Sequence, residues 1–321
     1  MKTLIRTSAL LAGLSFLGLA STSLAATLCE KEIPDSGYLR NFQKLEMGNG
    51  GWLFREHDLI TEFGPDRAGY NGLRALNTAL AERGTTLVIV PLPTRGIVHP
   101  EKLGDIEFTH SLAAKNYSLY LNRLRTVGLM APELTVLTNG DQEQALYFSR
   151  DHHWTPEGAK LTAGLVASLL EEAEILDNVA SMEFNTTIIQ TDSTKGSYSK
   201  AALELCKREF AAEDFNVFYT EPQLDIFADA AEPEVVLVGT SNSNGAKSFN
   251  FDGYLREALG VDVLNMATSG GGFDESLLLF LGSKEFSLHP PKVLIWEVPA
   301  YYSLKQASFY ESLVSALGEE S

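Results

Sequence analysis

Basic residues, cysteines and long apolar runs are scarce in this chain of 321 residues, and each scarcity excludes something. The 25 lysines and arginines stand against 42 aspartates and glutamates, for a formal charge of -17. A field of that sign repels nucleic acid and anionic membrane surfaces, so neither is expected as a partner. After the first 26 residues no apolar run suggests a membrane span, and the two cysteines allow at most one disulfide.

The N-terminus has the pattern of a secretory signal peptide over residues 1–25. A basic start is followed by an apolar run over 9–19 and then by small residues before a cut. The run is shorter than the ~20 residues of a relaxed membrane span. Leu28 precedes Cys29 where a lipoprotein signal requires a small residue, so no lipid or membrane anchor is expected. The sequence therefore predicts a periplasmic protein whose mature part, residues 26–321, is one domain.

Cleavage would also change the charge and the environment of the thiols. Removing Lys2 and Arg6 leaves 23 basic residues against 42 acidic ones, a formal charge of -19. In an oxidising compartment a disulfide persists. A bridge between Cys29 and Cys206 would tie the mature N-terminus to the middle of the chain, and two buried free thiols are the alternative.

Helix and strand patterns alternate along most of the chain. Apolar residues at helical spacing are followed by continuous apolar runs, which is typical of helices packed on buried strands. Helices are expected over 68–84, 111–128, 156–170, 251–259 and 275–281, and strands over 85–91, 134–137, 234–238, 261–264 and 292–298. Only 176–232 loses this order, and hairpins and loops are expected there. The alternation predicts an α/β fold with a mainly parallel sheet covered by helices on both faces.

Ser241 ends a predicted strand, where functional groups collect in parallel sheets. Gly239 would let the chain turn sharply and leave the hydroxyl projecting, and the backbone N–H of Ser241 would help to hold an oxyanion. Ser243 replaces the second glycine of the lipase-type elbow G-x-S-x-G, so this is not an ordinary α/β-hydrolase signature. A serine that only caps a helix or turn is the alternative.

Asp151 and His153 form the second candidate element, directly before the helix that starts at Pro156. Residues two apart on an extended segment point to the same side. The carboxylate of Asp151 would then hold the imidazole of His153 in the tautomer that a serine nucleophile needs. His152 would face away and receives no catalytic role.

Zinc binding is the rival interpretation of Asp-His-His. The other histidines show no paired spacing around it: His57, His99, His110 and His289. A metal there would leave Ser241 without a base, so serine catalysis without metal or cofactor is preferred. A histidine that only caps and packs, beside a core Trp154, is a third alternative.

A glycine run after another predicted strand supplies further backbone donors. Asn265, Gly270 and Gly271 are candidates to complete an oxyanion site, because consecutive glycines allow N–H groups to approach a ligand. A flexible strand-to-helix turn is the alternative. The run lacks Walker spacing, so phosphate binding is not expected.

The joint order of several motifs resembles a known family. These are Gly51-Trp52-Leu53-Phe54, Pro93-Thr94-Arg95-Gly96, Asp151-x-His153-Trp154, Val238-Gly239-Thr240-Ser241, Asn265 and Trp296-Glu297-Val298-Pro299. In this order they resemble the alginate O-acetylation proteins AlgX and AlgJ, over nearly all of residues 26–321. An early cysteine with a mid-chain partner is more similar to AlgX.

The resemblance implies an SGNH hydrolase-like fold with circularly permuted motif order, the Asp-x-His element preceding the serine. It implies that Ser241 becomes acetylated, that His153 is the base, that Asp151 orients it, and that a polysaccharide hydroxyl accepts the acetyl group. It also implies a membrane-bound acyltransferase and export-complex proteins as partners. Because the sequence ends at Ser321, we expect it to differ from AlgX in having no C-terminal carbohydrate-binding module.

Loss of that module and the acidic composition weaken the case for alginate, which is a polyanion. Arg95 and Arg150 are candidates to neutralise its carboxylates, and salt bridges to neighbouring acids are their alternative role. An O-acetyltransferase acting on an exopolysaccharide, foremost alginate, remains the leading hypothesis. The rivals are a carbohydrate acetyl-esterase, acetylation of another polymer such as cellulose, and a non-catalytic polymer-binding export protein.

Overall fold

The computed structural model describes residues 28, 38–42, 44–140, 143–223, 232–244, 249–305 and 307–318. The expected signal peptide and Cys29 lie outside these residues. Cys206, at the end of a helix, is not a free thiol. The bridge to Cys29 stays a prediction. No helix among the described residues has the length and apolarity needed to cross a membrane.

A four-stranded parallel sheet forms the centre of the molecule, in the order β3-β8-β6-β7. Its strands are β3 (Thr86–Leu92), β6 (Val235–Val238), β7 (Val263–Asn265) and β8 (Val293–Pro299). Every residue of β6 and β8 is buried, as expected of strands covered on both faces. Because all four strands run the same way, the residues that follow them gather at one edge of the sheet.

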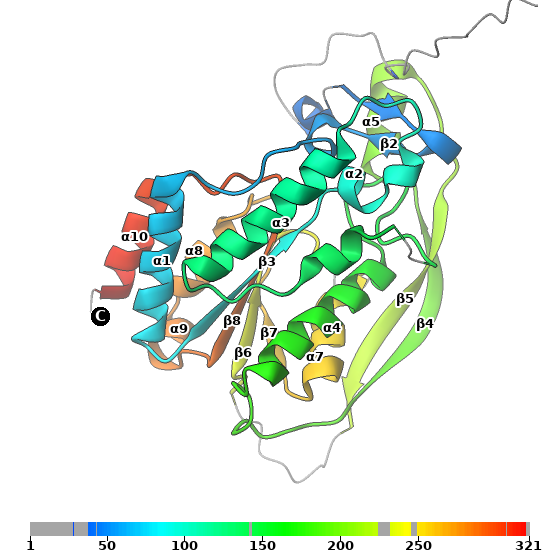
Figure 1. Ribbon diagram of the computed structural model, residues 1–321. Helices are drawn as coiled ribbons and strands as arrows, with labels where there is room; N and C mark the ends of the chain where they lie inside the picture. The colour runs from blue at the N-terminus through cyan, green and yellow to red at the C-terminus, as the bar shows by residue number, and fades with distance from the viewer. Residues whose placement is uncertain are drawn as a thin grey trace, which may run out of the picture.

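Helices cover both faces of this sheet and confirm the predicted α/β class (Figure 1). They are α1 (Arg67–Ala81), α3 (His110–Thr126), α4 (Pro156–Glu172), α7 (Phe251–Leu259), α8 (Glu275–Leu281), α9 (Lys284–Leu288) and α10 (Ala307–Gly318). At the start of α4 the side chain of Thr155 accepts a hydrogen bond from the Gly158 N–H, with Pro156 at the first helical position. This cap is the one that the sequence indicates.

Short elements complete the N-terminal part of the described chain. The pair β1 (Glu46–Met47) and β2 (Leu53–Phe54) is antiparallel, and α2 (Arg95–Val98) follows β3. Single 3-10 turns are η1 (Tyr38–Phe42), η2 (Asn49–Gly51), η3 (Glu56–Asp58), η4 (Pro100–Lys102) and η5 (Leu134–Thr138).

The strand expected at 134–137 is wrong, since that segment is η5. The chain touches the sheet earlier, where Met130 bridges Val88 and its carbonyl accepts the N–H of Ile89. Pro132 follows within two residues and has no N–H to extend the pairing. The apolar run after it therefore curls and buries Leu134 against the core.

The segment 176–232, expected as hairpins and loops, holds a long ribbon and a helix. Strands β4 (Phe184–Thr194) and β5 (Glu213–Pro222) pair antiparallel, and α5 (Ser197–Cys206) lies between them in the chain. Figure 1 shows the ribbon running beside α4 and α7, with α5 near β2 at its upper end. The helix was missed, and it lies beside the candidate active site.

Candidate active site

Ser241 lies just past the C-terminal end of β6, at the edge of the sheet where parallel strands end. Asp151 and His153 lie on a loop whose ends are pinned together: Tyr147 bridges Trp154, and the Thr155 N–H donates to the Leu146 carbonyl. The loop thus reaches the serine as a closed unit.

Loop and serine turn are joined directly. The indole N–H of Trp154 donates to the Asn242 carbonyl at 3.1 Å, which ties the residue after His153 to the residue after Ser241. Trp154 is buried and its ring packs on Phe251 at the start of α7. The core packing of Trp154 therefore fixes the distance between the two sequence elements.

The three predicted residues meet in one hydrogen-bonded chain. Ser241 Oγ lies 2.9 Å from His153 Nε2, and His153 Nδ1 lies 2.6 Å from Asp151 Oδ1. The His153 ring also stacks on Phe249, with centroids 5.2 Å apart. This is the geometry of a serine, a base and the carboxylate that orients the base.

The start of α5 holds Asp151 from its other side. The backbone N–H of Ser197 donates to Asp151 Oδ2 at 2.8 Å, and the Ser197 hydroxyl lies 3.2 Å from Oδ1. A helix N-terminus favours a negative charge. Burial opposes ionisation of Asp151, but the hydrogen bond and charge of His153 hold the pKa of this carboxyl well below its usual range. The carboxylate is therefore ionised at neutral pH.

Gly196 makes this approach of α5 possible. Its φ is +73°, and an added Cβ would lie 2.2 Å from the Arg150 carbonyl oxygen. The same carbonyl accepts the N–H of Tyr198. Only glycine allows the helix start to reach Asp151 so closely.

The prediction that His152 faces away from His153 is wrong. Its Nδ1 lies 2.8 Å from Ser197 Oγ, and its ring packs on that of His153 with centroids 3.8 Å apart. Burial, together with the charge of neighbouring His153, lowers the pKa of His152 well below its ordinary value. A neutral His152 thus completes the shell around Asp151.

The alternative of a metal site has a geometric basis. Ligand atoms of Asp151, His152 and His153 lie within 4.8 Å of one another. In the arrangement observed, however, both ring nitrogens of His153 are engaged, one with Asp151 and one with Ser241. A metal would have to break one of these contacts, so the arrangement suits serine chemistry better.

The candidate oxyanion residues are only partly brought to the serine turn. Asn265 donates its amide to the Ser243 carbonyl at 3.0 Å, which leaves one of its two N–H donors for another partner. Gly270 has a φ of +86°, which favours glycine, and a Cβ on Gly271 would overlap the Glu275 side chain, so both glycines have a structural reason that needs no ligand. Neither makes a described hydrogen bond to the turn.

The expectation that Arg95 contacts a polymer is wrong. Its side chain is 1% exposed, pairs with Asp58 at 3.0 Å, and donates to the carbonyls of Leu53, Phe148 and Ser149. These contacts support the Asp151 loop from beneath. The alternative role, a salt bridge to a nearby acid, is the one observed.

Arg150 is engaged in a similar way. Its Nε lies 3.7 Å from Glu213, and its guanidinium donates to the carbonyls of Ala211 and Gly51. The side chain also packs over Phe210. Its partners give Arg150 a role in holding β5 to the loop, and they do not support the expected contact with polymer.

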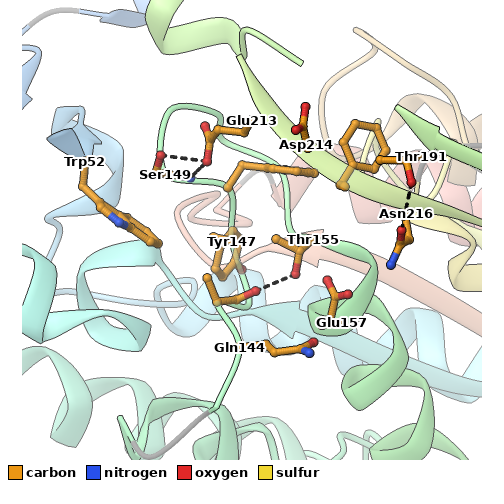
Figure 2. A pocket seen from close by; sticks show the side chains of 13 residues that line it. Trp52, Gln144, Tyr147, Ser149, Thr155, Glu157, Thr191, Glu213, Asp214 and Asn216 are labelled. Carbon is orange, nitrogen blue, oxygen red and sulfur yellow. Dashed lines mark hydrogen bonds between the residues drawn. The ribbon is translucent and has the colours of Figure 1, made fainter. Parts of the chain in front are cut away.

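A cavity of about 500 Å³ lies beside the two ends of the loop that carries Asp151 and His153 (Figure 2). Its walls come from Trp52, from residues within 144–149, from Thr155 and Glu157, and from β4 and β5, and none of the triad residues lines it. Glu157, Glu213 and Asp214 line it without any lysine or arginine. A polyuronate would be repelled there, so the cavity does not replace the arginines as an anion site.

Two residues around the triad were given no role in the sequence analysis. Ser197 and Phe249 lie 44 and more residues from Asp151 and His153 in the chain, and their contacts arise only when α5 and the segment before α7 fold against the loop. For Ser197 the sequence offers one local hint, the pair Gly196-Ser197, because both residue types are favoured where helices begin.

Known proteins share this fold. The family model described as "SGNH hydrolase-like domain, acetyltransferase AlgX" matches residues 45–300. The alginate biosynthesis protein AlgX of Pseudomonas aeruginosa is 40% identical over 96% of the chain and 69% of its own length. The probable alginate O-acetylase AlgJ of the same organism is 31% identical over 80% of the chain and 69% of its own length.

Two solved structures of AlgX and AlgJ have a fold similar to that of this chain. That of Pseudomonas aeruginosa AlgX superposes with a TM-score of 0.82 at 39% identity, covering 88% of this chain and 68% of that one. The O-acetyltransferase domain of Pseudomonas putida AlgJ superposes with a TM-score of 0.71 at 27% identity, covering 85% and 98%. The chain spans 60% to 69% of the length of the AlgX relatives it matches. By family model, sequence and fold, this chain belongs to the family of SGNH hydrolase-like AlgX acetyltransferase domains.

Proposed function

We propose that this protein transfers acetyl groups to hydroxyls of an exopolysaccharide, with Ser241 as nucleophile, His153 as general base and Asp151 as the group that orients the base. The observation that supports this most is the continuous contact Ser241 Oγ–His153 Nε2–Asp151, at 2.9 and 2.6 Å. Membership in an acetyltransferase family supports the acetyl group as the one transferred.

The first half-reaction loads the enzyme. Asp151 accepts the Nδ1–H of His153, which leaves Nε2 free to take the proton of Ser241 Oγ. Oγ attacks the carbonyl carbon of an acetyl donor, and the tetrahedral intermediate collapses as the leaving group departs with the proton from His153. Ser241 is left as an acetyl ester.

The second half-reaction reverses these roles with a new nucleophile. A sugar hydroxyl gives its proton to His153 Nε2 and its oxygen attacks the acetyl carbon. The Ser241 oxygen leaves and regains the proton from His153, so the acetyl ester now belongs to the polymer. The Ser241 N–H and the remaining Asn265 N–H are the proposed oxyanion donors, with Gly270 and Gly271 as further candidates.

Alginate is the proposed acceptor, because the relatives are an alginate biosynthesis protein and a probable alginate O-acetylase. We further propose that residues 26–321 act in the periplasm as one domain, after removal of 1–25. A membrane-bound acyltransferase of the export complex would supply the acetyl groups. The acidic composition makes a neutral polymer such as cellulose the acceptor to compare.

Intact-protein mass spectrometry tests the proposal. The mature protein is exposed to 4-nitrophenyl acetate, with and without alginate or cellulose oligomers, and Ser241→Ala is the control. We expect one acetyl group on the wild type, none on the variant, and transfer to the oligomer that the enzyme accepts. Discharge to water alone would instead identify an esterase, and absence of acetylation would favour a polymer-binding protein.

A further inference from the structure

A buried carboxylate lies directly beneath the serine turn. Strands β6 and β8 pair in parallel with Val238 opposite Trp296, so Glu297 comes next to the first residues beyond β6. The Glu297 side chain is 0% exposed. Burying a carboxylate is costly unless hydrogen bonds replace its water, so its partners are the evidence for a role.

Those partners all belong to the turn that presents Ser241. Glu297 Oε2 accepts the Thr240 N–H at 2.8 Å, the Thr240 hydroxyl at 3.0 Å and the Ser243 hydroxyl at 3.0 Å. Ser241 therefore lies between Thr240 and Ser243, which are both hydrogen-bonded to the same carboxylate. Burial raises the pKa of Glu297, and the donors from Thr240 and Ser243 work against that rise.

Gly239 is shaped by the same carboxylate. Its φ is not positive, so a turn does not demand glycine here. A Cβ at this position would lie 2.7 Å from Glu297 Oε2 and 3.0 Å from Ser243 Oγ. The glycine before the serine is therefore required by the close approach of Glu297, rather than by the sharp turn that the sequence suggests.

A second anchor comes from the opposite face of the sheet. Ser276 of α8 accepts the Gly239 N–H and donates to the Gly239 carbonyl, each at 2.9 Å. Ser276 fixes the residue at the end of β6, whereas Glu297 fixes the residues on both sides of Ser241. The two anchors act on different parts of the turn.

We propose that Glu297 is a positioning residue, which holds the 240–243 turn so that Ser241 Oγ stays within hydrogen-bond reach of His153. It touches neither substrate nor the reacting atoms. Its kinetic consequence rests on Ser241 being the nucleophile of the proposed function, whereas its effect on the turn does not.

Glu297→Gln tests the proposal with nearly unchanged volume. The amide carries no negative charge and keeps a single acceptor oxygen, so the Thr240 N–H and the hydroxyls of Thr240 and Ser243 lose the charge that strengthens their hydrogen bonds. We expect faster hydrogen–deuterium exchange in peptides that contain 239–244, and ~10–100-fold slower labelling of Ser241 by phenylmethylsulfonyl fluoride. Exchange elsewhere in the sheet should be unchanged.

Trp296→Phe is the matched control on the same strand. It removes one buried hydrogen bond, from the indole to the Phe273 carbonyl at 2.9 Å, without removing any side chain that grips the turn. It should lower stability while leaving the labelling rate of Ser241 near that of the wild type. Equal exchange at 239–244 in wild type and Glu297→Gln would overturn the proposal.

A second pair of variants keeps the test decisive if Glu297→Gln does not fold. Thr240→Val removes the hydroxyl that donates a hydrogen bond to Glu297, and Thr240→Ser keeps this hydroxyl. We expect slow labelling and fast exchange for valine only. Wild-type protein that is not labelled at all would contradict Ser241 as an activated nucleophile, and the exchange data would then decide on Glu297 alone.

Discussion

The carboxylate of Asp151 is held by four described hydrogen bonds. Two come from His153, through its backbone N–H and its Nδ1, and two come from Ser197. Such a carboxylate serves two purposes: it selects the tautomer of His153, and it stabilises the positive charge that the imidazole acquires. The two purposes have separate measurable consequences.

Asp151→Asn should lower the rate of Ser241 acetylation by about 10³–10⁴-fold, because the amide can hold His153 in the wrong tautomer. It should also change the pH dependence of stability. A carboxyl whose folded pKa is depressed adds stability above its unfolded pKa of about 3.9, and loses it as the pH falls below that value.

Urea unfolding of wild type and Asp151→Asn at pH 7 and pH 3 measures this second effect. The difference in unfolding free energy between the two proteins should be larger at pH 7 than at pH 3. A difference that grows on acidification would contradict the depressed pKa of Asp151.

Metal removal separates the two interpretations of Asp151, His152 and His153. Because serine catalysis needs no metal, exhaustive dialysis against EDTA should leave the acetylation rate of Ser241 unchanged. Added Zn²⁺ should inhibit, since it competes for the atoms that now bond Asp151 to His153. Activity lost with EDTA and restored by Zn²⁺ would support the metal alternative instead.

At the scale of elements, α5 decides whether the loop of Asp151 is properly placed. Its first N–H groups meet the loop at Asp151 and at the Arg150 carbonyl. The helix can begin there only because Gly196 has no Cβ to collide with that carbonyl. Catalysis should therefore depend on a residue that touches no substrate.

Gly196→Ala should slow acetylation of Ser241 strongly and destabilise the protein by ~1–3 kcal/mol, because both a positive φ and a collision are imposed. Gly84→Ala is the control: its φ is +79°, but nothing lies within 4 Å of an added Cβ. Gly84→Ala should lower the stability of the protein but leave the acetylation rate of Ser241 unchanged. Thermal unfolding and acetylation rates of both variants check this, and equal rates in the two would exclude a special role of α5.

Elements whose ends are marked locally were predicted well. The helices α7 and α8 have the predicted bounds, and α4 starts where Thr155 and Pro156 indicate. The strand expected at 134–137 failed because apolar content alone does not separate a buried strand from a buried 3-10 turn. The helix α5 was missed because it stands among polar residues of an exposed ribbon.

The whole molecule is acidic, and this governs its encounter with a charged polymer. The formal charge of the chain is -17, the cavity beside the loop is lined by three acids, and Arg95 is sequestered in the core. An acceptor made of uronates must approach against this field. The repulsion is long-range at low salt and short-range at physiological salt.

Raising the ionic strength from ~0.01 M to ~0.15 M shortens the Debye length from about 30 Å to about 8 Å. The KM for alginate oligomers should consequently fall severalfold, while the KM for cellulose oligomers stays constant. Steady-state transfer rates at several salt concentrations measure both. A KM for alginate that rises with salt would reveal a basic groove that attracts the polymer.

The sequence by itself determined the fold class and pointed to the three residues proposed to react. Both are encoded locally, in hydropathy periods along the chain and in the order of Asp151, His153 and Ser241. The tertiary structure alone decided that these residues meet, that α5 and Glu297 hold them, and that Arg95 supports the loop instead of facing solvent. Such contacts join segments separated by tens of residues, and only the packing of the core fixes which polar side chain is buried against which.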